Sequence, residues 1–128
     1  MPGARAYLEG VARLLHETGA GPIDIRVTTD DTIGRLSASL RVKGRRRLEV
    51  KARLRFFTTP ELHAYSFQLL EDDGAHVLRY DNVPHHKELP GFPHHRHRAG
   101  KGPEPVIPEP SIRTILGAIE DELEGWTV

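Results

Sequence analysis

The most constraining feature of the chain is a change of hydrophobic period near Ile23. Over residues 4–18 the apolar side chains recur at helical spacing, and a Gly-Ala-Gly-Pro run follows. From Ile23 to Phe56 the apolar residues instead alternate with polar ones in three consecutive runs. The polar breaks at 29–32 and 43–46 are too short for parallel crossovers. The sequence therefore predicts a helix followed by strands joined through hairpins.

Two more strands and a second helix complete the predicted order. Residues 62–70 and 75–80 flank Asp73-Gly74, a strong hairpin signal. Ser111 is a helix cap that precedes an apolar stripe at helical spacing, made of Ile112, Ile115, Leu116, Ile119 and Leu123. The predicted fold is α+β: a single antiparallel sheet of about five strands with an N-terminal and a C-terminal helix packed on it.

We expect one domain over residues 1–128, because this length suits a single core. Its parts are a helix at about 4–18, the sheet at about 23–81, a loop at 82–110 and a helix at about 111–124. Residues 82–110 are rich in His and Pro, and proline removes backbone donors, so we predict an irregular loop there.

The composition of the chain excludes several kinds of partner and chemistry. The 18 basic residues balance the 18 acidic ones, so any attraction to nucleic acid must be local. The chain has no cysteine, which excludes disulfides and thiol nucleophiles, and it has no apolar stretch long enough to be a signal or membrane segment. We expect a cytoplasmic protein that does not contact a membrane. The oligomeric state is not readable.

Five of the eight histidines lie within residues 85–97, which makes this stretch the best candidate for chemistry. The composite run from Arg79 through Asp81-Asn82, Pro84-His85-His86 and Pro93-His94-His95-Arg96-His97 resembles the signature of the TumE-type toxins of prokaryotic toxin–antitoxin modules. The resemblance covers roughly the second half of the chain. It implies a toxin encoded beside an antitoxin, commonly a DNA-binding protein, and an action on RNA or translation.

Metal-independent RNA cleavage needs a base, an acid and a cation beside the phosphate, and this stretch can supply all three. We favour His86 and His95 as the acid–base partners. The other catalytic candidates are His85, His94, His97 and Tyr80. Of these, Tyr80 can stack a base or donate a proton. The candidates for holding the phosphate are Arg79, Lys87 and Arg96.

A basic hairpin is a second candidate surface for binding RNA. Lys51, Arg53 and Arg55 share one face of a predicted strand, opposite its apolar residues. That face can track phosphates, although a solvated face of a half-buried sheet is the simpler interpretation.

Two other classes of function stay open. No cofactor is required by the sequence, but a divalent metal is a rival interpretation of the histidines, with His85, His94, Asp81 and Glu88 as candidate ligands for a metal-dependent nuclease or nucleotide-modifying enzyme. Alternatively, the chain is a non-catalytic binding module whose histidines fix a loop that contacts the antitoxin or a ribosomal target.

Overall fold

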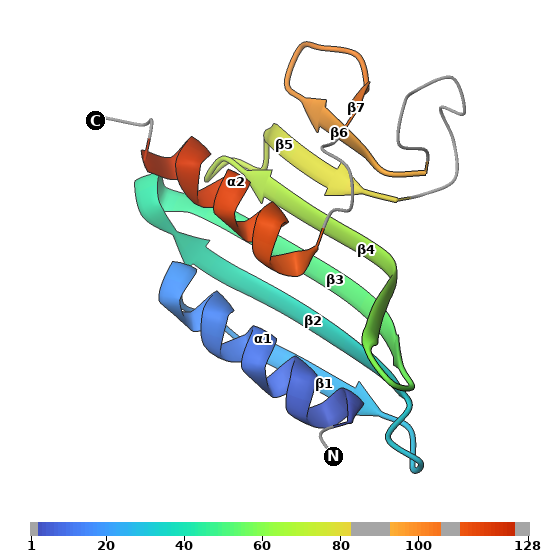
Figure 1. Cartoon of the computed structure of the whole chain (residues 1–128). Helices are drawn as coiled ribbons and strands as arrows, with labels where there is room; N and C mark the ends of the chain where they lie inside the picture. The colour runs from blue at the N-terminus through green and yellow to red at the C-terminus, as the bar shows by residue number, and fades with distance from the viewer. Residues whose placement is uncertain (1–2, 83–92, 106–110, 125–128) are drawn as a thin grey trace.

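A computed structural model describes residues 3–82, 93–105 and 111–124. Its elements are α1 (Ala4–Thr18), β1 (Ile23–Val27), β2 (Ile33–Val42), the short 3-10 turn η1 (Lys43–Arg45), β3 (Arg46–Phe56), β4 (Pro60–Leu70), β5 (His76–Asp81), β6 (His95–Arg98), β7 (Glu104–Pro105) and α2 (Ile112–Glu124). The strands form one antiparallel sheet in the order β1 to β7, each beside the next in sequence. Figure 1 shows both helices on the same side of this sheet. The predicted α+β class and both helices are confirmed.

The core lies between the sheet and the two helices. In β2 and β3 the even-numbered residues from Leu36 to Leu54 are buried, whereas most odd-numbered ones are exposed. This is the period of two that a strand with one covered face requires. The five apolar residues of the α2 stripe are all buried, as are Leu8 and Leu15 of α1. The other face of the sheet is covered by neither helix, and we call it the open face.

One glycine sets how closely α1 approaches the sheet. Gly34 of β2 faces the core, and a Cβ built there would lie 2.5 Å from Cδ1 of Leu8. That separation is far below van der Waals contact, so the absence of a side chain is what lets α1 pack at its observed distance.

Ser111 caps the N-terminus of α2, as predicted. Its hydroxyl accepts a hydrogen bond from the Thr114 amide at 3.1 Å.

The predicted number of strands was too low, and the predicted loop at 82–110 was wrong in part. Residues 95–98 form β6 and residues 104–105 form β7. The proline density of the region suggested irregular structure, but no proline falls between Pro93 and Pro103, so β6 can complete a ladder with β5. Pro105 lies in the outermost strand, where a missing donor costs little. Within the described residues, neither helix is long and apolar enough to cross a membrane.

Candidate functional site on the open face

A row of three arginines crosses the open face. The strand register places Arg26 of β1 opposite Arg35 of β2, and Arg35 opposite Arg53 of β3. All three are exposed, as are Lys51 and Arg55 on β3. We call these five residues the basic face. Like charges directly opposite each other destabilise a sheet, so stability does not explain this row.

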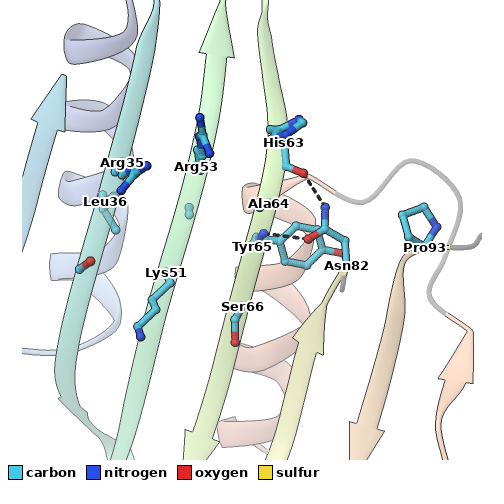
Figure 2. Close-up of a pocket in the computed structure, with 12 residues that line it drawn as sticks. Arg35, Leu36, Lys51, Arg53, His63, Ala64, Tyr65, Ser66, Asn82 and Pro93 are labelled. Carbon is cyan, nitrogen blue, oxygen red and sulfur yellow. Dashed lines mark hydrogen bonds between the residues drawn. The ribbon is translucent and has the colours of Figure 1, made fainter. Parts of the chain in front are cut away.

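A pocket of about 820 Å³ opens on this face (Figure 2). Its lining includes Arg35, Lys51 and Arg53 on one side and Asn82 and Pro93 on the other. The volume lies within the range of ordinary small-molecule sites.

Asn82 builds the far wall of the pocket by completing the hydrogen bonding of β4. The register of β3 and β4 shifts between Arg53 and Leu54, which leaves His63 without a facing residue. The Asn82 side chain accepts a hydrogen bond from the Tyr65 amide at 2.9 Å and donates one to the His63 carbonyl at 2.9 Å. An asparagine carries both a donor and an acceptor, so it can replace a strand partner at such an irregularity.

The open face continues from the basic residues to the histidines. One cross-strand row runs through Ser37, Lys51, Ser66, Asp81 and His95, from β2 to β6. The next row carries Arg79 of β5 opposite His97 of β6. Since residues in one row point to the same side of a sheet, Asp81, His95, Arg79 and His97 share the face of Lys51.

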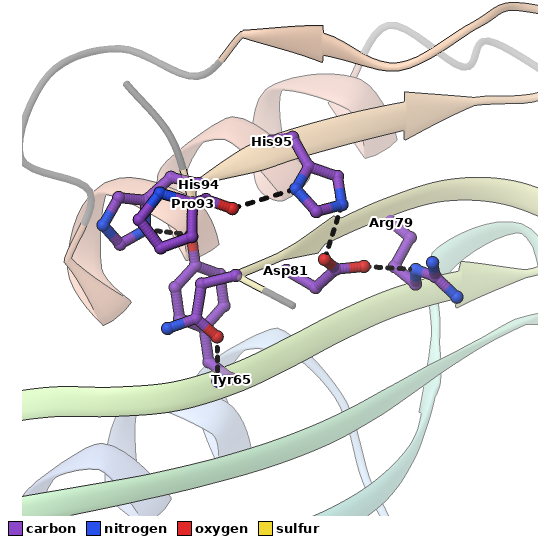
Figure 3. A network of polar contacts seen from close by, with 7 residues as sticks. Tyr65, Arg79, Asp81, Pro93, His94 and His95 are labelled. Carbon is purple, nitrogen blue, oxygen red and sulfur yellow. Dashed lines mark hydrogen bonds and ion pairs between the residues drawn. The ribbon is translucent and has the colours of Figure 1, made fainter. Parts of the chain in front are cut away.

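Asp81 lies at the centre of a polar network (Figure 3). Its Oδ1 is 2.7 Å from Nε2 of His95, and its Oδ2 is 2.6 Å from Nε of Arg79. The side chains of Asp81 and His95 are each 1% exposed, whereas that of Arg79 is 36% exposed, so the network is buried at its centre and reaches the surface at Arg79. His95 Nδ1 donates to the Pro93 carbonyl at 3.0 Å. Both ring nitrogens of His95 therefore face acceptors, and the ring is fixed from both sides.

His97 adds a second ring to this network. Its ring meets that of His95 edge to face, with centroids 4.8 Å apart. One ligand atom from each of Asp81, His95 and His97 lies within 4.8 Å of the others. His97 is partly exposed, unlike the other two. We call Asp81, His95 and His97 the histidine cluster.

His94 is held in a separate contact with Tyr65. The Tyr65 hydroxyl lies 2.9 Å from Nδ1 of His94, and the two rings stack with centroids 5.7 Å apart. Burial, together with the negative charge of Asp81, raises the pKa of the Tyr65 hydroxyl. Burial, together with the electrostatic effect of the neighbouring His95, lowers the pKa of His94. Both groups are therefore neutral near pH 7, and their contact anchors the start of β6 to β4.

A family model described as Toxin TumE matches residues 12–126. The chain belongs to the TumE toxin family. No curated protein and no solved structure matches it. The match begins inside α1 and so includes the first strands, beyond the half of the chain in which the motif lies. As a member of this family the chain is the toxin component of a toxin–antitoxin module, and its partner is a cognate antitoxin.

The structure separates the predicted site residues of this TumE-family chain into three groups. His95, His97, Asp81 and Arg79 come together on the open face, where Lys51, Arg53 and Arg55 also lie. Tyr80 and Arg96 face the helix side instead: Tyr80 is 5% exposed, and Arg96 contacts both its hydroxyl and Glu104. Apart from His94, which contacts Tyr65, the remaining candidates are outside the described residues, namely His85, His86, Lys87 and Glu88.

The predicted metal ligands that the structure describes, Asp81 and His94, lie in different contacts. Asp81 lies beside His95 and His97, whereas His94 contacts Tyr65. Their roles, and the pairing of His86 with His95, stay predictions.

Sequence reasoning missed Arg26, Arg35 and Asn82 as parts of the open face. The arginines carry a usable signal, since each occupies a polar position of an alternating strand, but only the register shows that they lie in one row with Arg53. Asn82 lies within the motif, but nothing in its neighbours along the chain indicates that its amide pairs with β4.

Proposed function

We propose that this toxin cleaves RNA, which it holds along the basic face and cuts at the histidine cluster of β5 and β6. The observation that carries the proposal is the shared row of Lys51, Asp81 and His95 on one face of the sheet. Two strand spacings, roughly 9.5 Å, separate the backbone of Lys51 from that of Asp81. One strand of RNA bound across the sheet can therefore span from Lys51 to the edge of the cluster at His97, whereas Asp81, which is 1% exposed, stays buried beneath it.

The charge arrangement supports a polyanion as the ligand. Arg35 and Arg53 repel each other in the free protein because they are exposed neighbours in the register, and Arg26 lies opposite Arg35 while its Nε contacts Asp24 at 3.0 Å. A phosphate backbone lying over them would relieve that repulsion and release its own counterions. The overall charge of zero does not oppose this, because a local patch decides binding at short range.

The geometry changes which histidine is the best candidate for the chemistry. His95 has one ring nitrogen on Asp81 and the other on the Pro93 carbonyl, so it holds its place in the network. His97 is the partly exposed residue of the cluster, with its Nε2 atom buried, and it lies opposite Arg79 in the register. RNA cleavage through the 2′-hydroxyl needs a proton-transfer group and a cation close to the same phosphate. His97 and Arg79 are the residues we propose for meeting the RNA there.

The test is cleavage of a labelled single-stranded RNA by the purified chain, with His97→Ala and His76→Ala as the matched pair. His76 lies on β5 outside the cluster, so its variant controls for loss of a histidine from the same part of the sheet. We expect wild type and His76→Ala to cut, and His97→Ala to lose at least 100-fold in rate while its circular dichroism stays unchanged. Absence of cutting by wild type with and without added Mg²⁺, Mn²⁺ or Zn²⁺ would overturn the proposal.

A further inference from the structure

We infer that the histidine cluster is a divalent-metal site, with Asp81, His95 and His97 as the ligands and an ion of the zinc class as the occupant. Two imidazoles and one carboxylate are a donor set that zinc and its neighbours in the first transition row accept. Metal binding requires no RNA, so this inference stands or falls separately from the proposed function. In a loaded site His97 would serve as a ligand, and an ion-bound water would take over the proton transfer assigned to it above.

The spacing of the ligand atoms fits a single ion. Nitrogen and oxygen ligands lie about 2.0–2.2 Å from zinc, so two of them at tetrahedral angles are roughly 3.4 Å apart. In the structure His95 Nε2 and Asp81 Oδ1 are 2.7 Å apart, and the three ligand atoms all lie within 4.8 Å of one another. The observed separations bracket the required one, and side-chain movements of about 1 Å would bring all three atoms to an ion.

The contacts around the cluster are those that orient metal ligands. A ligating histidine usually donates its second ring N–H to a carbonyl or carboxylate, which fixes the nitrogen that faces the ion. His95 does this: Nδ1 donates to the Pro93 carbonyl, and Nε2 is directed at Asp81. Arg79 contacts the other carboxylate oxygen, Oδ2, and so leaves Oδ1 facing the histidines. Both buried ligands are thus held by the chain in the orientation that an ion needs.

The charges on this face indicate what would fill the remaining coordination position. A divalent ion beside Arg79, with Asp81 as the one carboxylate of the cluster, leaves the site with net positive charge. Lys51 lies in the same cross-strand row and adds to it. An anionic oxygen would therefore be favoured as a further ligand, and a phosphate oxygen of RNA is one under the proposed function.

The experiment is a calorimetric titration of Zn²⁺ into tag-free, EDTA-treated full-length chain, repeated with Co²⁺ to record the visible absorption of the bound ion. The ligand variants are His97→Ala, which alters a partly exposed residue, and Asp81→Asn, which keeps the side-chain shape. The controls are His63→Ala and His76→Ala, which remove histidines outside the cluster, and a His85→Ala/His86→Ala double variant. Circular dichroism checks that each variant is folded.

We expect one ion per wild-type chain, and at least a tenfold higher Kd in both ligand variants, because replacing even an outer contact of a metal site costs about 10- to 100-fold. The controls should keep the wild-type Kd. Wild-type affinity in both ligand variants, or loss of binding in the His85→Ala/His86→Ala variant alone, would overturn the inference. Binding without RNA cleavage would support the metal site and count against the ribonuclease. RNA cleavage by a chain that binds neither ion would support the ribonuclease and count against the metal site.

Discussion

Removing the positive charges of Arg35, Lys51 and Arg53 should weaken RNA binding by an amount that the structure allows us to estimate. The three residues are exposed on adjacent strands and line one pocket, so we assign each of them one phosphate. For single-stranded nucleic acid, each such contact contributes about 0.7 to the slope of log K against log salt. A triple glutamine variant should therefore lose about 2 from that slope. If the affinities of the two proteins converge near 1 M salt, the variant binds about 100-fold more weakly at 0.1 M, which is roughly 2.8 kcal/mol.

Fluorescence anisotropy of a labelled 2′-O-methyl RNA measures this directly, because the blocked 2′-oxygen prevents cleavage during the titration. The matched control removes three exposed arginines from the two helices, Arg5, Arg13 and Arg113, and so changes the net charge equally. That control should keep the wild-type slope, because its charges lie on the other side of the sheet.

The stability of the same variant provides an independent check. Arg35 and Arg53 repel each other across the strands, so their replacement should leave the free energy of unfolding equal or higher by a few tenths of a kcal/mol. An unchanged salt slope in a folded triple variant, or an equal loss in the helix control, would refute the assignment of RNA to the basic face.

Two further changes test how the fold supports the site. Asn82→Ala removes both hydrogen bonds that the side chain makes to the β4 backbone, and urea unfolding should show a loss of about 1–3 kcal/mol; a loss below 0.5 kcal/mol would mean that water replaces the amide. Gly34→Ala pushes a methyl group against Leu8 and should cost about 1–3 kcal/mol by the same measurement, whereas Gly102→Ala, which meets no atom within 4 Å, should be neutral. Equal stability of the two glycine variants would show that α1 shifts freely.

Local patterns determined most of the fold. The period of two from Ile23 to Phe56 and the helical stripe of α2 each follow from one covered face, so their elements could be predicted. β6 has no such signal, because Arg96 and Arg98 on one side and His95 and His97 on the other are all polar. Its pairing with β5 comes from tertiary contacts, which hydrophobic periodicity does not record.

The candidate site was predictable in composition and unpredictable in geometry. The density of histidine indicates where chemistry is to be sought, but the adjacent His94 and His95 turn out to have different partners, Tyr65 and Asp81. Successive residues of a strand point to opposite faces, so only the start of β6 decides which of the two joins Asp81. A shift of one residue would exchange them.

The two faces of this sheet carry different constraints, and this difference would let a chain with zero net charge bind the polyanion that we propose as its ligand. The helix face fixes stability through apolar packing, and the exposed Glu120 and Asp121 of α2 lie on that side of the molecule. The open face makes no comparable apolar contribution, so it can hold opposed arginines that cost the fold only tenths of a kcal/mol each. Asp81 and His95 are the exception, because they are buried on the open face. Substitutions of the basic face should therefore separate RNA binding from stability, whereas substitutions of Asp81 should affect both.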